Sequence, residues 1–150
     1  MENNPQTIKE IIAEFFEKMT ISVSVDVETK EDRISVALIT NESSALIGEN
    51  GETLSDLQQI LRLVLRKRLN PTPFFFDIDI NNYKQEKIDR IKDVVRGAID
   101  EVIVMGKEKI LLPMTAAERR IVHTEINSRT DVKSESIGEE PDRRVVIKPI

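Results

Sequence analysis

The spacing of apolar residues alternates between the helical and the strand period from residue 6 to residue 81, and this alternation restricts the fold more than any other feature of the chain. Residues 7–19 carry apolar side chains at helical spacing, and Thr7 and Glu10 have the spacing of a capping box. The chain is therefore predicted to open with an amphipathic helix over 7–19 that packs against a core.

Strand-like alternation of apolar and polar residues follows this helix. The further predicted elements are a strand in ISVSVDVE, a turn at KED, a strand in DRISVALIT, a short helix in ESSALI, a helix over about 52–68 and a strand in FFFDIDI. The segment NPTP ends the longer helix because proline cannot continue it. The order helix, strand, strand, helix, helix, strand predicts a complete α+β domain over residues 6–81.

From residue 82 the pattern changes to one long helix, which runs to about residue 105. It is followed by a short strand in KILLP, a helix over 115–127 and two strands in DVKSESI and RRVVIKP. Thr115 and Glu118 form a second potential capping box at the start of the later helix. A second, smaller domain of a long helix, a helix and three short strands is predicted over residues 82–150.

Composition excludes several classes of protein. With no cysteine and one histidine, the chain is expected to have no disulfide, no metal site and no cofactor. No apolar run approaches the roughly 20 residues that cross a bilayer, so a cytoplasmic protein without membrane insertion is predicted. A net charge of -5 argues against a strongly basic nucleic-acid binder, and the low aromatic content predicts recognition by backbone and shape.

The sequence GENG, residues 48–51, lies between the two later helices of the first domain. Its glycines either form a tight corner or let a sugar-phosphate backbone approach the start of a helix, where an anion is favoured. Glu49 and Glu52 oppose this because they repel phosphate. The nucleic-acid-binding residues predicted here are Ile47, Gly48, Glu49, Asn50, Gly51, Leu54, Arg62 and Arg66.

In the second domain, Arg119 and His123 lie four residues apart on a predicted helix and so share one face. The nucleic-acid-binding residues predicted on this face and on the last strand are Arg119, Arg120, His123, Asn127, Arg143 and Arg144. Two alternatives stay open: His123 is a histidine whose hydrogen bonds are satisfied within the protein, and Arg119 bridges to an acidic neighbour.

GENG between two helices in this order of elements resembles the loop of a type II KH domain. The segment from LPMTAAERRIVH to RRVVIKP resembles an R-three-H domain, named for an arginine and a histidine separated by three residues. Together they resemble the bacterial Jag family, also called SpoIIIJ-associated proteins, from about Thr7 to Pro149. The resemblance implies a cytoplasmic RNA-binding protein linked to cell elongation and division, with a homodimer or a small KH-domain protein as partner. We expect the N-terminal domain and linker of many Jag proteins to be absent.

The leading hypothesis is a non-catalytic module that binds single-stranded RNA through the loop and the Arg119/His123 face. The alternative is a protein-interaction scaffold or dimerisation module with weak nucleic-acid binding, which the net acidity and Glu49 favour. An enzyme is the weakest hypothesis because the sequence has no P-loop, nucleophile motif or metal-ligand cluster. Single-stranded DNA stays open as a ligand, since contacts to the 2′-hydroxyl cannot be identified from sequence.

Overall fold

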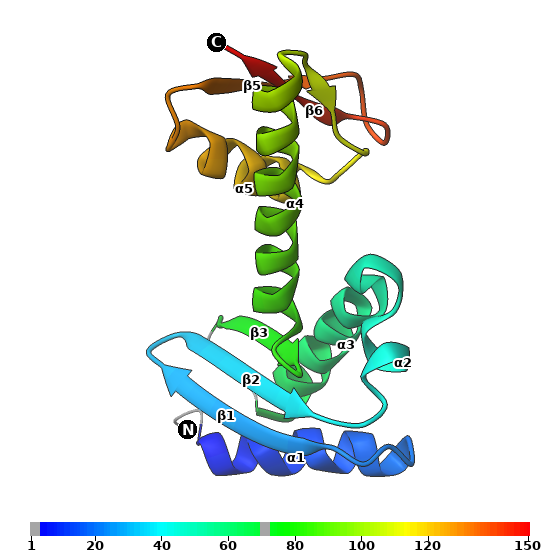
Figure 1. The fold of residues 1–150 in the computed structure, drawn as a ribbon. Helices are drawn as coiled ribbons and strands as arrows, with labels where there is room; N and C mark the ends of the chain where they lie inside the picture. The colour runs from blue at the N-terminus through cyan, green and yellow to red at the C-terminus, as the bar shows by residue number, and fades with distance from the viewer. Residues whose placement is uncertain (1–3, 70–72) are drawn as a thin grey trace. The chain divides into compact units, whose positions relative to one another are not determined.

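The computed structural model describes residues 4–69 and 73–150, and the chain divides into two compact units after Lys84 (Figure 1). Each unit combines helices with a small sheet, so the chain is α+β as predicted. The predicted domain boundary between residues 81 and 82 stays a prediction. Within the described residues, no helix is long and apolar enough to cross a membrane.

The first unit packs three helices with a three-stranded sheet (Figure 1). Its elements are α1 (Pro5–Lys18), β1 (Ser24–Lys30), β2 (Arg33–Ile39), α2 (Ser43–Ile47), the short 3₁₀ helix η1 (Glu49–Gly51), α3 (Glu52–Leu69) and β3 (Phe75–Ile80). The strand order is β1-β2-β3; β1 and β2 are antiparallel, and β2 and β3 are parallel. Parallel strands need a long crossover, which α2 and α3 provide. The predicted order of elements is confirmed, while the NPTP break lies, except for Pro73, outside the described residues.

The predicted start of the first helix is wrong. The helix begins at Pro5, and the side-chain oxygen of Asn4 accepts a hydrogen bond of 2.9 Å from the Gln6 amide. Proline suits the first helical position because its fixed φ is already helical and the missing N–H would have no partner there. Thr7 therefore lies inside the helix, and Glu10 accepts a hydrogen bond from the Gln6 side chain instead.

The first strand begins at Ser24, three residues later than the predicted strand at Ile21. Thr20 has a φ of 57°, and the Ile21 amide donates to the Phe16 carbonyl at 3.1 Å. The chain therefore leaves α1 through a left-handed residue before it extends. Ile21 and Val23 still pack against the core, which explains why their alternation resembled a strand.

The core of the first unit is formed by one face of the sheet and by the apolar stripes of α1 and α3. The fully buried side chains are Ile8, Ile12, Phe16, Ile34, Leu38, Leu61, Leu65, Ile78 and Ile80. The alternation predicted for FFFDIDI is confirmed, since Phe74, Phe76, Ile78 and Ile80 are all buried. On α3 the buried stripe is narrow: Ile60 is 48% exposed, because leucines at steps of three and four already cover the sheet.

The second unit has one long helix, a shorter helix and a second three-stranded sheet. Its elements are α4 (Tyr83–Met105), whose first two residues belong to the first unit, β4 (Lys109–Ile110), α5 (Ala116–Asn127), β5 (Val132–Ile137) and β6 (Arg144–Pro149). The strand order is β4-β6-β5, and both pairs are antiparallel. The fully buried side chains are Val95, Val102, Val122, Val145, Ile99, Ile126 and Ile147. Met105, the last residue of α4, is 65% exposed because the helix ends there, before Gly106 with its φ of 63°.

Candidate nucleic-acid interface

The GENG loop turns the chain sharply between α2 and α3 (Figure 1). Gly48, Asn50 and Gly51 all have positive φ, at 71°, 52° and 80°. Glycine reaches this region without a steric penalty, and asparagine is one of the few other residues that tolerate it. The loop conformation therefore depends on its residue types and brings the end of α2 to the start of α3.

Neighbours within the chain also leave no room for a side chain at Gly48 and little room at Gly51. A Cβ on Gly48 would lie 2.2 Å from Thr53 Oγ1 and 2.8 Å from Thr53 Cβ, and a Cβ on Gly51 would lie 3.2 Å from Tyr83 Cε1. The tight-corner interpretation thus accounts for both glycines without a ligand. The absent side chains of the two glycines would also let a phosphate backbone approach the loop closely, and this approach stays a prediction.

Three amides around the loop already have acceptors. The amides of Gly48, Gly51 and Glu52 donate to the carbonyls of Ser44, Gly48 and Glu49, the second at a long 3.5 Å. The attraction of this loop for phosphate therefore rests on the positive end of the α3 dipole rather than on these amides. Glu49, which is exposed, opposes that attraction.

The other predicted residues of the first unit differ in accessibility. Ile47 is half-buried, and Leu54 is only 4% exposed because it belongs to the core. Arg62 and Arg66 are exposed on α3, and within the described residues neither forms an ion pair. Arg68 is held instead by Glu14 on α1, with an N to O distance of 2.6 Å. Among the described residues, three cations of α3 thus form no ion pair: Lys67 and the two arginines that the sequence predicted.

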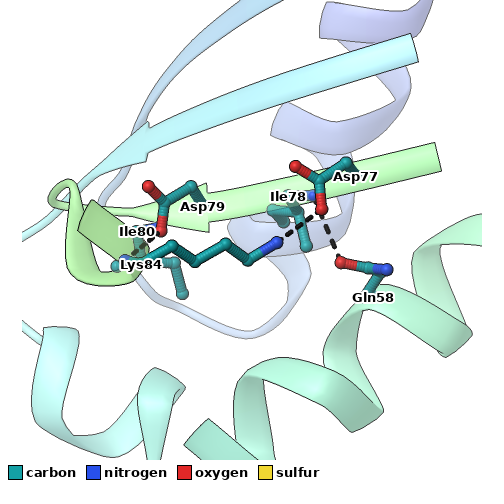
Figure 2. Close-up of polar contacts among 6 residues, drawn as sticks. All are labelled: Gln58, Asp77, Ile78, Asp79, Ile80 and Lys84. Carbon is teal, nitrogen blue, oxygen red and sulfur yellow. Dashed lines mark hydrogen bonds and ion pairs between the residues drawn. The ribbon is translucent and has the colours of Figure 1, made fainter. Parts of the chain in front are cut away.

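The free edge of β3, beside α3, is covered by polar side chains (Figure 2). Gln58 Oε1 on α3 accepts a hydrogen bond of 3.3 Å from the Ile78 amide. Asp79 Oδ1 accepts from the Ile80 amide at 3.0 Å and from the Lys84 amide at 3.2 Å. Lys84 Nζ forms an ion pair with Asp77. Two amides of the edge strand are thus occupied, which protects the edge against pairing with another strand.

In the second unit, the predicted capping box at the start of α5 is confirmed. The Thr115 hydroxyl accepts from the Glu118 amide at 3.3 Å, and Glu118 accepts from the Thr115 amide at 2.8 Å. Burial alone would raise the pKa of Glu118, but the Thr115 amide and the Lys87 ammonium outweigh it and lower that pKa. Glu118 is therefore held by the Thr115 amide and by Lys87, and both contacts are structural.

Arg119 points into the unit and is 7% exposed. Its Nη1 donates to the Met114 carbonyl at 2.7 Å, and its Nη2 pairs with Glu140 Oε1 at 2.8 Å. These are the contacts that the structural alternative for Arg119 requires. A direct contact between Arg119 and nucleic acid stays a prediction.

His123 lies between two serines of β5. Its Nδ1 is 2.7 Å from Ser134 Oγ, and its Nε2 is 2.7 Å from Ser136 Oγ. Residues two apart on a strand share a face, so the two hydroxyls straddle the imidazole ring. Both ring nitrogens have partners within the protein, and His123 fixes α5 to β5.

The remaining predicted residues of the second unit lie at the surface or near it. Arg120, Asn127 and Arg143 are exposed, and Arg144 is half-buried with its Nε donating to the Asp142 carbonyl at 3.0 Å. Arg129, which lies nearby, forms an ion pair with Asp131. Its guanidinium lowers the pKa of the Asp131 carboxyl. The surface is mixed in charge, and in the described chain no group of histidine, cysteine, aspartate and glutamate side chains could hold a metal ion.

Sequence reasoning missed four residues that shape these regions, namely Gln58, Ser134, Ser136 and Glu140. The two serines had a detectable signal, since they share a face of the predicted strand in DVKSESI. Gln58 and Glu140 had none, because their partners are 20 or more residues away along the chain.

Comparisons with known proteins bear on both units. A family model described as the R-three-H domain matches residues 89–149. A protein of Clostridium symbiosum named RNA-binding protein KhpB is 28% identical over 148 residues, which are 95% of this chain and 66% of that protein. The Bacillus subtilis protein of the same name is 30% identical over 127 residues, 81% of this chain and 60% of that protein. The chain thus spans less than two thirds of the length of these relatives, and only 39% of the Streptococcus pneumoniae protein of that name.

Proposed function

We propose that this chain, which is similar to the KhpB proteins of the Jag family and matches the R-three-H domain over residues 89–149, binds single-stranded RNA without catalysing a reaction. The similarity to a protein named RNA-binding protein KhpB over 95% of the chain is the observation that carries the proposal, because it includes both units. A cytoplasmic location and a regulatory role in cell elongation and division, which the resemblance implies, are part of the same proposal.

We propose that residues 6–81 form a type II KH domain and residues 82–150 the R-three-H domain. Two features of the first unit support the KH assignment: the order α1, β1, β2, α2, α3, β3, and the GENG corner between α2 and α3. In this proposal the RNA backbone lies against the corner, with the α3 dipole and the free side chains of Arg62 and Arg66 supplying attraction. Glu49 keeps the affinity of this unit low because its exposed carboxylate repels phosphate.

The test is fluorescence anisotropy of labelled single-stranded RNA and DNA pools, titrated with the chain at about 50 mM and about 200 mM salt. We expect RNA binding that weakens with salt and that weakens further in Asn50→Asp. Aspartate tolerates the same positive φ, so this variant adds one carboxylate to the loop while it keeps the backbone. Absence of RNA binding at the lower salt concentration contradicts the proposal. Equal RNA affinity of wild type and variant contradicts only the part of the proposal in which the GENG loop contacts RNA.

A protein-interaction module is the second candidate function, and the exposed apolar side chains of Ile60 and Leu63 on α3 favour it. These residues lie three apart and so share one face of the helix. Sedimentation analysis across a wide concentration range tests this candidate. A concentration-dependent dimer that Leu63→Glu abolishes supports it, whereas a monomer at every concentration that still binds RNA contradicts it.

A further inference from the structure

We infer that Arg119 serves RNA binding as a positioning residue that holds the β5–β6 loop, residues 138–143, and that Arg143 on this loop contacts the phosphate backbone. The inference rests on the proposed RNA binding and assigns different roles to two arginines that the sequence places together. It follows from where the two guanidinium groups lie and what each one contacts.

The Arg119 guanidinium is already used by the protein. Nη1 donates to the Met114 carbonyl at 2.7 Å, and Nη2 donates to Glu140 Oε1 at 2.8 Å, with a side chain that is 9% exposed. An arginine in such a position would have to break a buried hydrogen bond to reach a phosphate outside. Direct contact is therefore disfavoured for this residue.

The partners of Arg119 connect it to the loop at two points. Glu140 belongs to the loop itself. Met114, whose carbonyl accepts from Arg119, donates its own amide to the Arg143 carbonyl at 3.1 Å. Arg119 therefore fixes Glu140 through its side chain and the Arg143 backbone through Met114.

Within the described residues the loop has one further internal bond, in which the Asp142 amide donates to the Glu139 carbonyl at 2.9 Å, and one bond from β6, in which Arg144 Nε donates to the Asp142 carbonyl at 3.0 Å. Its first residue, Gly138, has a φ of 80°, so the chain turns there. With so few internal bonds, the position of the loop depends on Arg119.

Arg143 has the accessibility that Arg119 lacks. It is exposed, and within the described part of the chain its side chain forms no hydrogen bond or ion pair. The loop also carries Glu139, Glu140 and Asp142, which repel phosphate. Arg119 pairs with one of these three carboxylates, so it also reduces the negative charge beside Arg143.

The test compares RNA affinity in Glu140→Ala and Glu139→Ala, which remove one carboxylate each from the same loop. Glu139 is the matched control because only its backbone holds the loop. We expect Glu139→Ala to bind RNA slightly more tightly, as loss of a negative charge predicts. Glu140→Ala is expected to bind about threefold to tenfold more weakly despite the same charge change, and Glu140→Gln, which keeps an acceptor oxygen, to recover part of the loss.

Two further measurements separate the possible failures. Arg143→Ala is expected to reduce the slope of log Kd against log salt by about 0.7, the value for one phosphate contact to a single strand. Hydrogen exchange at residues 138–143 is expected to speed up in Glu140→Ala and not in Glu139→Ala. If Arg119 contacts phosphate directly, Glu140→Ala frees it and RNA binding becomes tighter. That result overturns this inference but leaves the proposed RNA binding intact. Absence of RNA binding by the wild type overturns the proposed function as well.

Discussion

Replacing Glu49 with lysine is expected to tighten RNA binding about fourfold if the GENG loop holds a phosphate. Glu49 is exposed in η1, and within the described residues it forms no ion pair, so its replacement breaks no contact. Asn50, the next residue, has a positive φ, but Glu49 itself does not, so a lysine can adopt the backbone conformation of Glu49. The perturbation is thus a change of charge beside the proposed phosphate.

The magnitude is worked out for a phosphate about 5 Å from the charge of residue 49. Two unit charges about 5 Å apart in water interact with about 0.8 kcal/mol, so a change from -1 to +1 alters the energy by about 1.7 kcal/mol. Screening at physiological salt, with a Debye length of about 8 Å, reduces this to about 0.9 kcal/mol, or about fourfold in Kd. The salt slope is expected to rise by up to about 0.7, because the lysine releases one more counterion.

Glu31→Lys is the control, because it makes the same substitution in the β1–β2 turn. The seven residues of β2 separate that turn from the α2 end of the sheet, a length of about 20 Å that exceeds the screening distance. Fluorescence anisotropy with a single-stranded RNA pool measures both variants. Equal affinity gains in the two variants would mean that only net charge matters, and an unchanged Kd in Glu49→Lys would refute phosphate binding at the loop.

Three further predictions concern the stability of the units. Gly48→Ala is expected to destabilise the first unit by at least about 1–2 kcal/mol in urea unfolding, because of its φ of 71° and the clash with Thr53; an unchanged midpoint contradicts this. The pKa of Glu14 is lowered to about 2 by hydrogen bonds from Arg68 and Lys18, so its stabilising effect is complete above its ordinary pKa of 4.5 and disappears as pH falls to about 2. The difference in urea midpoint between wild type and Glu14→Gln should shrink over that range, and a difference that is constant with pH refutes the assignment. His123→Phe is expected to lower the stability of the second unit by about 1–3 kcal/mol, since it leaves two serine hydroxyls without the ring; a loss no larger than that of a surface substitution on α5 contradicts this.

The strands and the core faces could be predicted because a period of two directly fixes which side chains share a face. In β3 every predicted inward residue is buried, since the neighbouring strand and the helices leave no other arrangement for Phe76, Ile78 and Ile80. The first residue of α1 could not be predicted from the apolar spacing. Asn4 and Thr7 are both good capping residues, and the choice between them depends on Pro5 rather than on the apolar spacing.

The orientation of the predicted site residues required the structure. Helical spacing correctly placed Arg119 and His123 on one face of α5, but it does not say that β5 and the β5–β6 loop lie against that face. The acceptors of both residues come from later segments of the chain, which local sequence does not reveal. Local sequence also did not reveal that Leu54, predicted to bind nucleic acid, has its side chain in the core.

The most direct test of RNA binding by this chain is photo-crosslinking of a single-stranded RNA pool that contains 4-thiouridine, followed by mass spectrometry of the crosslinked peptides. We expect crosslinks in two segments, residues 47–54 around the GENG loop and residues 138–144 at the β5–β6 loop. Crosslinks confined to other surfaces, such as α1 or the β1–β2 turn, would contradict it.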